Sequence, residues 1–249
     1  MNLDRIITVR KNKTIYRDVD RCYKVFNEDY PKVAVLNEAL NCARMEESEL
    51  NVPKMLEVTL IDNKWTIVYE YVNGKTLSKL IKEDPSKTDE YLNMFVDLQK
   101  YMHSLSMPRL VSLKDKMTNK ICKTELQATV RFDFHMRLEE MSKENRVCHG
   151  DYDLSNVILA DNGKLYVIDW AHAAQGTPLA DVAMTFIKLW LEGDEDIAES
   201  YLTLYCEKSG TDKRDAHKWM PIVAAAKLSD GNSAEREMLK NWVNVVDFQ

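Results

Sequence analysis

The chain of 249 residues is long enough to bury a sizeable core, and 45% hydrophobic with 30% charged residues is ordinary for a globular protein. A net charge of −6 without a basic cluster argues against nucleic-acid binding, and no apolar run is long enough to span a bilayer. Five scattered cysteines without a Cys-x-x-Cys pair are typical of reduced thiols. We therefore expect a cytoplasmic protein that binds neither nucleic acid nor membrane.

The first third of the chain has the pattern of a β-rich lobe. Short β-forming runs alternate with polar turns and are predicted as strands, at residues 6–9, 14–16, 21–26, 55–61 and 65–71. In the third run, Lys24 is a charge inside an otherwise β-forming segment.

A helix is predicted from Val33 to about Met45. Its small and apolar residues recur at helical spacing, and this periodicity puts Glu38 on the same stripe. A buried carboxylate needs a partner, and Lys24 is the obvious candidate. From periodicity alone, the alternative that Lys24 and Glu38 are both solvated surface residues stays equally open.

The remaining chain reads as mainly helical. Gly74 is the first glycine in the sequence, and it follows the last predicted strand, so the crossing between two lobes is expected near residues 71–74. Helices are predicted at residues 77–82, 88–105, 123–141, 178–191, 194–210, 212–229 and 232–246, with an interruption near Pro221. Residues 107–122 are basic and are expected to be irregular. The pattern predicts an α+β protein with an N-terminal lobe, 1–72, and a C-terminal lobe, 73–249.

A hairpin interrupts the helical part. The apolar runs 157–159 and 165–168 flank an Asn-Gly turn, which accepts the positive φ angles of a tight hairpin. A hairpin brings its outer ends together, so Asn156 and Asp169 should be neighbours. An amide oxygen beside a carboxylate suits Mg²⁺ that binds substrate phosphates. Asp151, five residues before Asn156, is then a candidate base.

These residues stand in two motifs, HGDYDLSN (residues 149–156) and VIDW (167–170). Together they resemble the catalytic segment of the aminoglycoside phosphotransferase and choline kinase family, the small-molecule relatives of protein kinases. The resemblance implies a two-lobed protein-kinase-like fold. It also implies that Asp151 is the catalytic base and that Asn156 and Asp169 hold Mg²⁺.

The resemblance extends to the N-terminal part. Lys24 and Glu38 are similar to the kinase Lys–Glu pair, in which the lysine steadies the α- and β-phosphates of ATP. The segment Glu70, Tyr71 and Val72 is similar to the connection between the lobes, whose backbone groups bind adenine. ATP is therefore the expected phosphoryl donor, with GTP left open. Asp181 matches an acidic residue of the family for which a structural role, bracing the segment around Asp169, is implied.

Two features depart from protein kinases. The absence of glycine before Gly74 excludes a Gly-x-Gly-x-x-Gly phosphate loop, so the turn Val9–Thr14 would have to cover the phosphates with side chains and a few amides. Only eight residues separate Asp169 from Pro178, which is too short for the activation segment of a protein kinase. The second departure favours a small acceptor over a protein.

We therefore expect a kinase that moves the γ-phosphoryl group of ATP to a hydroxyl group of a small molecule that resembles an aminoglycoside, choline or a sugar. The C-terminal acids and aromatics could bind such an acceptor, or they could be solvated and core residues: Trp170, Trp190, Glu192, Asp194, Glu195, Asp196 and Trp219. A catalytically silent nucleotide-binding module is the alternative, and a protein kinase is the third possibility. The sequence leaves the acceptor and the oligomeric state open.

Overall fold

The computed structural model describes residues 5–230 and 233–243. They form two compact units. One comprises the described residues up to Thr88 together with Leu154–His172, and the other comprises Asp89–Asp153 together with the described residues from Ala173 onward. The predicted division at residue 72 coincides with neither limit of these units, so that assignment of functional lobes stays a prediction.

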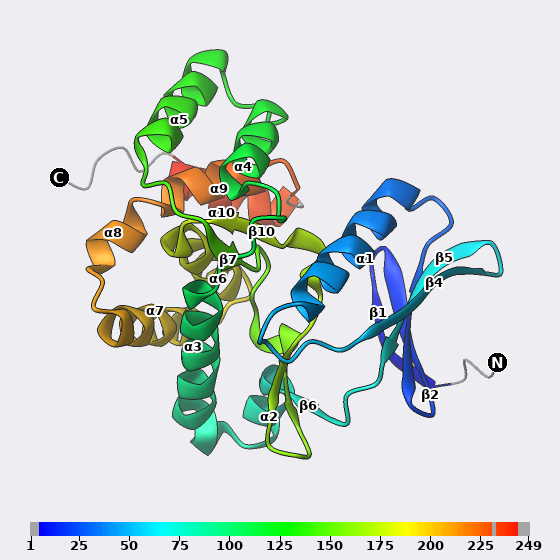
Figure 1. Ribbon diagram of the computed structural model, residues 1–249. Helices are drawn as coiled ribbons and strands as arrows, with labels where there is room; N and C mark the ends of the chain where they lie inside the picture. Colours follow the sequence, from blue (N-terminus) through cyan, green and yellow to red (C-terminus); the bar gives the residue numbers. More distant parts are fainter. Residues whose placement is uncertain (1–4, 231–232, 244–249) are drawn as a thin grey trace. The chain divides into compact units, whose positions relative to one another are not determined.

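The first unit is built on an antiparallel five-stranded sheet with the order β1-β2-β3-β5-β4 (Figure 1). Its strands are β1 Arg5–Arg10, β2 Lys13–Asp18, β3 Arg21–Phe26, β4 Met55–Ile61 and β5 Lys64–Glu70. The five strands predicted from short β-forming runs between polar turns are therefore confirmed.

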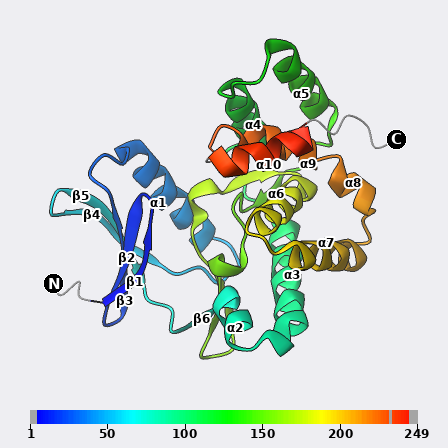
Figure 2. The same ribbon diagram turned by 180° about the vertical axis from the view of Figure 1, so that it is seen from behind.

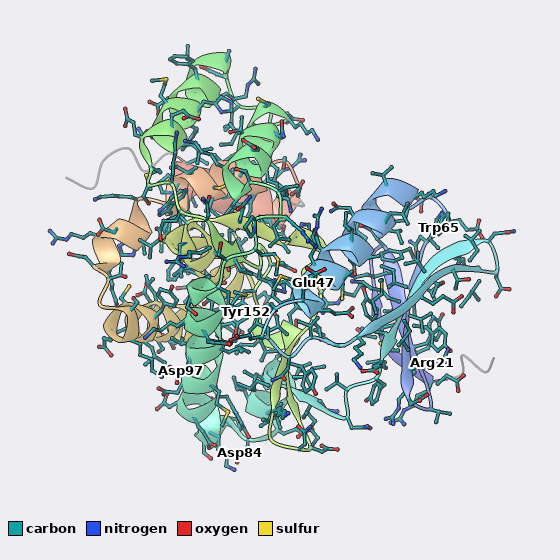
Figure 3. The ribbon with its side chains drawn as sticks, viewed as in Figure 1. Arg21, Glu47, Trp65, Asp84, Asp97 and Tyr152 are labelled. Atoms are coloured by element: carbon teal, nitrogen blue, oxygen red, sulfur yellow. The ribbon has the colours of Figure 1, made fainter. Side chains whose placement is uncertain are left out.

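One helix, α1 (Lys32–Glu46), packs on this sheet. Val35 and Ala39 of α1 meet Phe26 and Ile67 of the sheet in a buried cluster, so the apolar stripe predicted for the helix faces the strands. Trp65, labelled in Figure 3, lies on β5 and packs against the edge of that cluster. This packing fixes α1 next to β3 and β5.

A second, three-stranded sheet of the same unit has the order β6-β8-β9. Its strands are β6 Gly74–Thr76, β8 Val157–Ala160 and β9 Leu165–Val167. The hairpin between β8 and β9 is confirmed, with Gly163 at a φ of 80° in its turn. The short helices α2 (Leu77–Glu83), η1 (Pro85–Lys87), η2 (Leu154–Asn156) and η3 (Trp170–His172) complete this unit.

The second unit is mainly helical (Figure 2). Its helices are α3 Thr88–Ser104, α4 Leu113–Cys122, α5 Ala128–Glu140, α6 Pro178–Leu191, α7 Glu195–Ser209, α8 Lys213–His217, α9 Met220–Lys227 and α10 Ser233–Val243. The apolar helix α6 packs against α7, α8 and α9. The strands β7 (Arg146–Cys148) and β10 (Ala174–Gly176) pair antiparallel. No helix in the described part of the chain is long and apolar enough to cross a membrane.

Two details of the helical prediction are wrong. Residues 107–122 are not irregular throughout, because α4 starts after Ser112, whose hydroxyl caps the helix by accepting from the Asp115 amide. Helix α5 begins at Ala128, five residues after the predicted start. The interruption predicted near Pro221 is confirmed, because α8 ends at His217 and α9 begins at Met220, with the proline in its first turn. The predicted ends of the last helix, at 232 and 246, lie outside the described residues.

Candidate active site

Lys24 is the centre of a charged cluster in the first unit. It lies on β3, is 5% exposed, and donates hydrogen bonds from Nζ to Oε1 of Glu38 and, at 2.8 Å, to Oδ1 of Asp169. Glu38 lies on α1 and is 2% exposed. The predicted contact between Lys24 and Glu38 is therefore present, and the alternative of two solvated surface residues is wrong.

Glu38 has a second partner. The hydroxyl of Tyr69, on β5, donates to Oε1 of Glu38 at 3.3 Å. Burial and the neighbouring charge of Glu38 hold the pKa of Tyr69 well above its usual value, so this hydroxyl stays a donor. A buried carboxylate is expensive unless it is paired and hydrogen-bonded, and Glu38 meets both conditions.

Asp169 follows the hairpin and has a backbone φ of 66°, a region that residues other than glycine seldom occupy. Its Oδ1 accepts from Lys24 and its Oδ2 accepts from Lys13 of β2 at 2.8 Å. Burial alone would raise the pKa of Asp169, but the two ammonium groups outweigh it and hold that pKa well below its usual range. The carboxylate is therefore charged, and each of its oxygens is paired with a lysine.

The hairpin brings Asn156 to the same end as Asp169. Val157 pairs with Val167, and the next amide, Ile168 N, donates to the carbonyl of Asn156 at 2.9 Å. Asn156 is 1% exposed. An Asn side-chain oxygen and a charged carboxylate are the hard donors that Mg²⁺ prefers, so this pair fits the metal that the sequence predicts.

The segment Glu70–Val72 runs on from β5. The amides of Glu70 and Tyr71 donate to the carbonyls of Lys54 and Asp20, at 2.9 and 2.8 Å. Adenine contacts from this segment would therefore use its carbonyl groups or the Val72 amide. A cavity of about 310 Å³ is lined by the segment together with residues of the β8–β9 turn.

In the second unit, Asp151 lies on a loop that is held from two sides. The carboxylate of Asp181, at the start of α6, accepts from the amides of His149 and Gly150 at 3.1 and 2.7 Å. The His149 ring in turn accepts from the Asp151 amide through Nδ1 at 3.3 Å. Asp181 thus braces the loop that carries Asp151, whereas the resemblance implied that it braces the segment around Asp169.

Lys188 of α6 also contacts this loop. Its Nζ donates to Oδ1 of Asp151 at 2.7 Å and lies 3.7 Å from Oδ2 of Asp153. Burial would lower the pKa of Lys188, but the charges of Asp151 and Asp153 outweigh it and raise that pKa. A permanently charged ammonium group therefore stands beside the candidate base.

Asp181 belongs to a buried polar network. His103 of α3 contacts Oδ2 of Asp181 through Nε2 at 3.1 Å and the Tyr205 hydroxyl through Nδ1 at 2.7 Å. His103 is 5% exposed, and both of its ring nitrogens have protein partners. These contacts are those of a structural histidine in a buried hydrogen-bond network. Tyr152 (Figure 3) fixes the same loop to α3, since it stacks on Phe95 with ring centroids 4.3 Å apart.

The aromatic residues considered for acceptor binding are mostly part of the core. Trp170 and Trp219 are 2% and 5% exposed, and the indole of Trp170 donates to the Val167 carbonyl. Trp190 is half-buried and lies edge-on to Trp242. Trp190 is thus the accessible tryptophan of the three. The acids from Glu192 to Asp196 are exposed.

Three residues of the site were missed by sequence reasoning: Lys13, Tyr69 and Lys188. Lys13 belongs to the turn that was expected to cover phosphates, but nothing in the pattern singled it out. Lys188 interrupts the apolar helix α6, which is a signal for a buried lysine that needs a carboxylate partner. Tyr69 carries no comparable signal.

Comparison with known proteins supports this reading of the fold. The model of the phosphotransferase enzyme family matches residues 10–219. Protein LicA of Haemophilus influenzae is 27% identical over 202 residues, which cover 74% of this chain and 72% of that protein.

Among solved structures, choline kinase LicA from Streptococcus pneumoniae superimposes with a TM-score of 0.64 at 15% identity, covering 99% of this chain and 94% of that one. A thermostable mutant of aminoglycoside phosphotransferase APH(4)-Ia, in a ternary complex with ADP and hygromycin B, gives 0.70 at 14% identity, covering 95% and 90%. The predicted α+β, two-lobed, protein-kinase-like fold is therefore confirmed.

Proposed function

The chain belongs to the phosphotransferase enzyme family, a family of small-molecule kinases, and from this premise we propose that it moves the γ-phosphoryl group of ATP to a hydroxyl group of a small molecule. The observation that carries the proposal is the cluster of Lys24, Glu38 and Asp169, because it contains the charges that a kinase needs for a metal–nucleotide complex. Solved relatives of the same fold in complex with ADP or AMP-PNP support a nucleotide as the donor.

The first unit supplies the proposed nucleotide residues. Lys24, held by Glu38, would steady the α- and β-phosphates, and Asn156 and Asp169 would hold Mg²⁺. When bound, Mg²⁺ would offset negative charge on the phosphate oxygens. Carbonyl and amide groups of residues 70–72 would bind the base, which suits ATP or GTP equally.

The second unit supplies the proposed base. Asp151 would accept the proton of the acceptor hydroxyl while the hydroxyl oxygen forms the new bond to the γ-phosphorus atom. The bond between that phosphorus and the β–γ bridging oxygen breaks, and ADP leaves with its electron pair. Transition states of this kind are loose, so orientation and electrostatics supply most of the rate. Lys188 would hold the Asp151 carboxylate in one orientation.

The acceptor is proposed to be a choline-, aminoglycoside- or sugar-like alcohol. The two solved relatives differ here, since one is named a choline kinase and the other is in complex with hygromycin B. Trp190 and the exposed acids that follow it could attract an ammonium group. Neither of these observations favours choline over an aminoglycoside.

The test is ATP turnover with and without a panel of choline, aminoglycosides, sugars and nucleosides. Turnover that rises with one acceptor, and a phosphorylated product found by mass spectrometry, are expected. Asp151→Asn should slow that reaction by about 100- to 10,000-fold while it leaves ATP binding intact. If ATP binds but neither transfer to any acceptor nor slow hydrolysis occurs, the protein is the silent nucleotide-binding module. Labelling of generic protein substrates would instead favour a protein kinase.

A further inference from the structure

The connection between β1 and β2 has to cover the phosphates without glycine. The first glycine of the chain is Gly74, so this connection lacks the residues without a Cβ that let a glycine-rich loop bring its backbone close to a phosphate. Any group that contacts a phosphate from here is therefore most simply a side chain. Lysine is a common phosphate ligand in proteins.

Lys13 is the lysine that is placed to do this. It is the first residue of β2 and pairs with Arg10 of β1 and Phe26 of β3. On the neighbouring strand, Lys24 pairs with Ile15, two residues beyond Lys13, so both lysines project from the same face of the sheet. Their ammonium groups meet at one carboxylate, that of Asp169, each at 2.8 Å.

The charges of this cluster balance only while Asp169 has no metal. Lys13 and Lys24 are matched by Glu38 and Asp169. A divalent cation on Asp169 would leave four positive charges facing two carboxylates. Such a surplus in a part-buried site requires further anions, and the phosphates of a nucleotide would supply them.

Of the two lysines, Lys13 is the one that can change partners at lower cost. The side chain of Lys24 is 6% exposed and Glu38 continues to pair with it if Asp169 is withdrawn. The Lys13 side chain is 18% exposed and its ion pair is with Asp169. If a metal ion binds the Asp169 carboxylate, the ammonium group of Lys13 therefore needs another anion within reach.

We propose that Lys13 is a phosphate-binding residue of this kinase, which pairs with Asp169 in the nucleotide-free protein and moves to the β- and γ-phosphates when Mg²⁺ and ATP bind. This inference rests on the proposed function, because it assumes that Asp169 serves the metal of a nucleotide. It assigns to one ammonium group the role that backbone amides have in a glycine-rich loop.

The experiment is equilibrium binding of ATP and of adenosine to the wild-type chain and to Lys13→Gln, with Lys79→Gln as the control. Lys79 is an exposed lysine of the same unit, so its variant removes the same charge outside the cluster. Lys13→Gln should weaken ATP binding in Mg²⁺ on the order of 10- to 100-fold, as the loss of a charged hydrogen bond does. Adenosine affinity should be unchanged in both variants, and Lys13→Arg should recover most of the ATP affinity.

Magnesium separates the exchange of partners from simple charge attraction. In EDTA, Lys13 remains on Asp169, so the loss of ATP affinity in Lys13→Gln should be smaller than in Mg²⁺. An equal loss in both conditions would overturn the exchange, and an unchanged ATP affinity in Mg²⁺ would overturn the role of Lys13 altogether. Failure of the wild-type chain to bind ATP would overturn the proposed function itself. Circular dichroism of each variant checks folding, and Lys13→Arg keeps the charge that folding of the cluster needs.

Discussion

Lys188 donates a hydrogen bond from Nζ to Oδ1 of Asp151 at 2.7 Å, although the two lie 37 positions apart in the sequence. The contact joins helix α6 to the loop that carries the proposed base. An ammonium group in this position holds the carboxylate in one orientation and offsets the charge of Asp153 beside it. The proposed chemistry of the second unit therefore depends on a residue outside the HGDYDLSN motif.

We expect Lys188→Met to lower kcat on the order of 10- to 100-fold, because a misplaced reacting group costs about that much. The affinity for ATP should hardly change, since the proposed nucleotide residues belong to the other unit. Steady-state kinetics and nucleotide titration measure the two effects separately. Lys208→Met is the matched control, because it removes a lysine that pairs with Asp97 at the surface. A kcat equal to that of the wild type would contradict the positioning role.

The ion pair between Lys24 and Glu38 should stabilise the folded protein. Lys24→Met leaves two carboxylates, Glu38 and Asp169, without their shared cation, and it should lower the free energy of unfolding by about 3–5 kcal/mol. The double variant Lys24→Met with Glu38→Gln should recover part of this loss, because a neutral amide needs no counter-ion. Urea unfolding of the single and double variants measures both values.

The control for this cycle is the exposed pair of Lys75 and Glu83, whose side chains are 49% and 43% exposed. Lys75→Met should change the free energy of unfolding by less than about 1 kcal/mol, because solvent screens a surface ion pair. If the urea midpoint of unfolding were the same for Lys24→Met as for the wild type, the pairing of Lys24 would not stabilise the fold.

The buried carboxyl group of Asp181 should make the stability of the folded state depend on pH. Burial would raise its pKa, but the hydrogen bond and charge of His103 and the amide of Gly150 outweigh burial and lower that pKa below the ordinary 3.8. A carboxyl group whose pKa is depressed by folding stabilises the folded state above its unfolded pKa. That contribution is lost as the pH falls through the lower, folded value.

We therefore expect Asp181→Asn to lower the free energy of unfolding by roughly 2–4 kcal/mol near pH 7, since the carboxylate accepts several hydrogen bonds. The difference from the wild type should narrow as the pH falls below 3.8 and through the lower pKa of the folded state, at which the wild-type carboxyl group also becomes neutral. Urea midpoints at about pH 7 and about pH 3 measure it. Asp97→Asn, at an exposed position, is the control, and a difference that stayed constant with pH would contradict the ionised state of Asp181.

Local sequence patterns predicted the parts of the fold that depend on hydrophobic periodicity and on turn residues. The stripe on α1 correctly grouped Glu38 with the residues that face the sheet, although periodicity alone left its burial open. The Asn-Gly turn correctly gave the β8–β9 hairpin with Asn156 and Asp169 at one end. In both cases a short segment decides which side is buried, independently of the remaining chain.

Contacts between distant segments could not be derived in this way. Periodicity tells which face of an element is buried, but it does not tell which residue faces it. Lys13 meets Asp169 across 156 positions of sequence, and Lys188 meets Asp151 across 37. The missed helix α4 is a different kind of failure, because its signal was present. Its buried residues Leu113, Met117 and Ile121 recur every four positions, but the many charges between them concealed the pattern.

Gly74, at the end of the connecting segment, occupies a position with no room for a larger side chain. A Cβ atom on this residue would lie 2.3 Å from the Leu159 carbonyl oxygen and 2.6 Å from Cα of Ala160, which are backbone atoms of the paired strand β8. Backbone cannot move aside as a flexible side chain can. Strand β6 would have to withdraw from β8, and the residues just before Gly74 would move with it.

We therefore expect Gly74→Ala to lower the free energy of unfolding on the order of 1–3 kcal/mol and also to weaken ATP binding, because residues 70–72 are proposed to bind the base. Thermal melting and nucleotide titration measure the two effects. Gly163→Asn is the matched control in the neighbouring turn, where φ is 80° and no atom lies within 4 Å of an added Cβ. Asparagine tolerates that φ, so this variant should melt close to the wild type. If Gly74→Ala did so as well, the close approach of β6 to β8 would not limit this position.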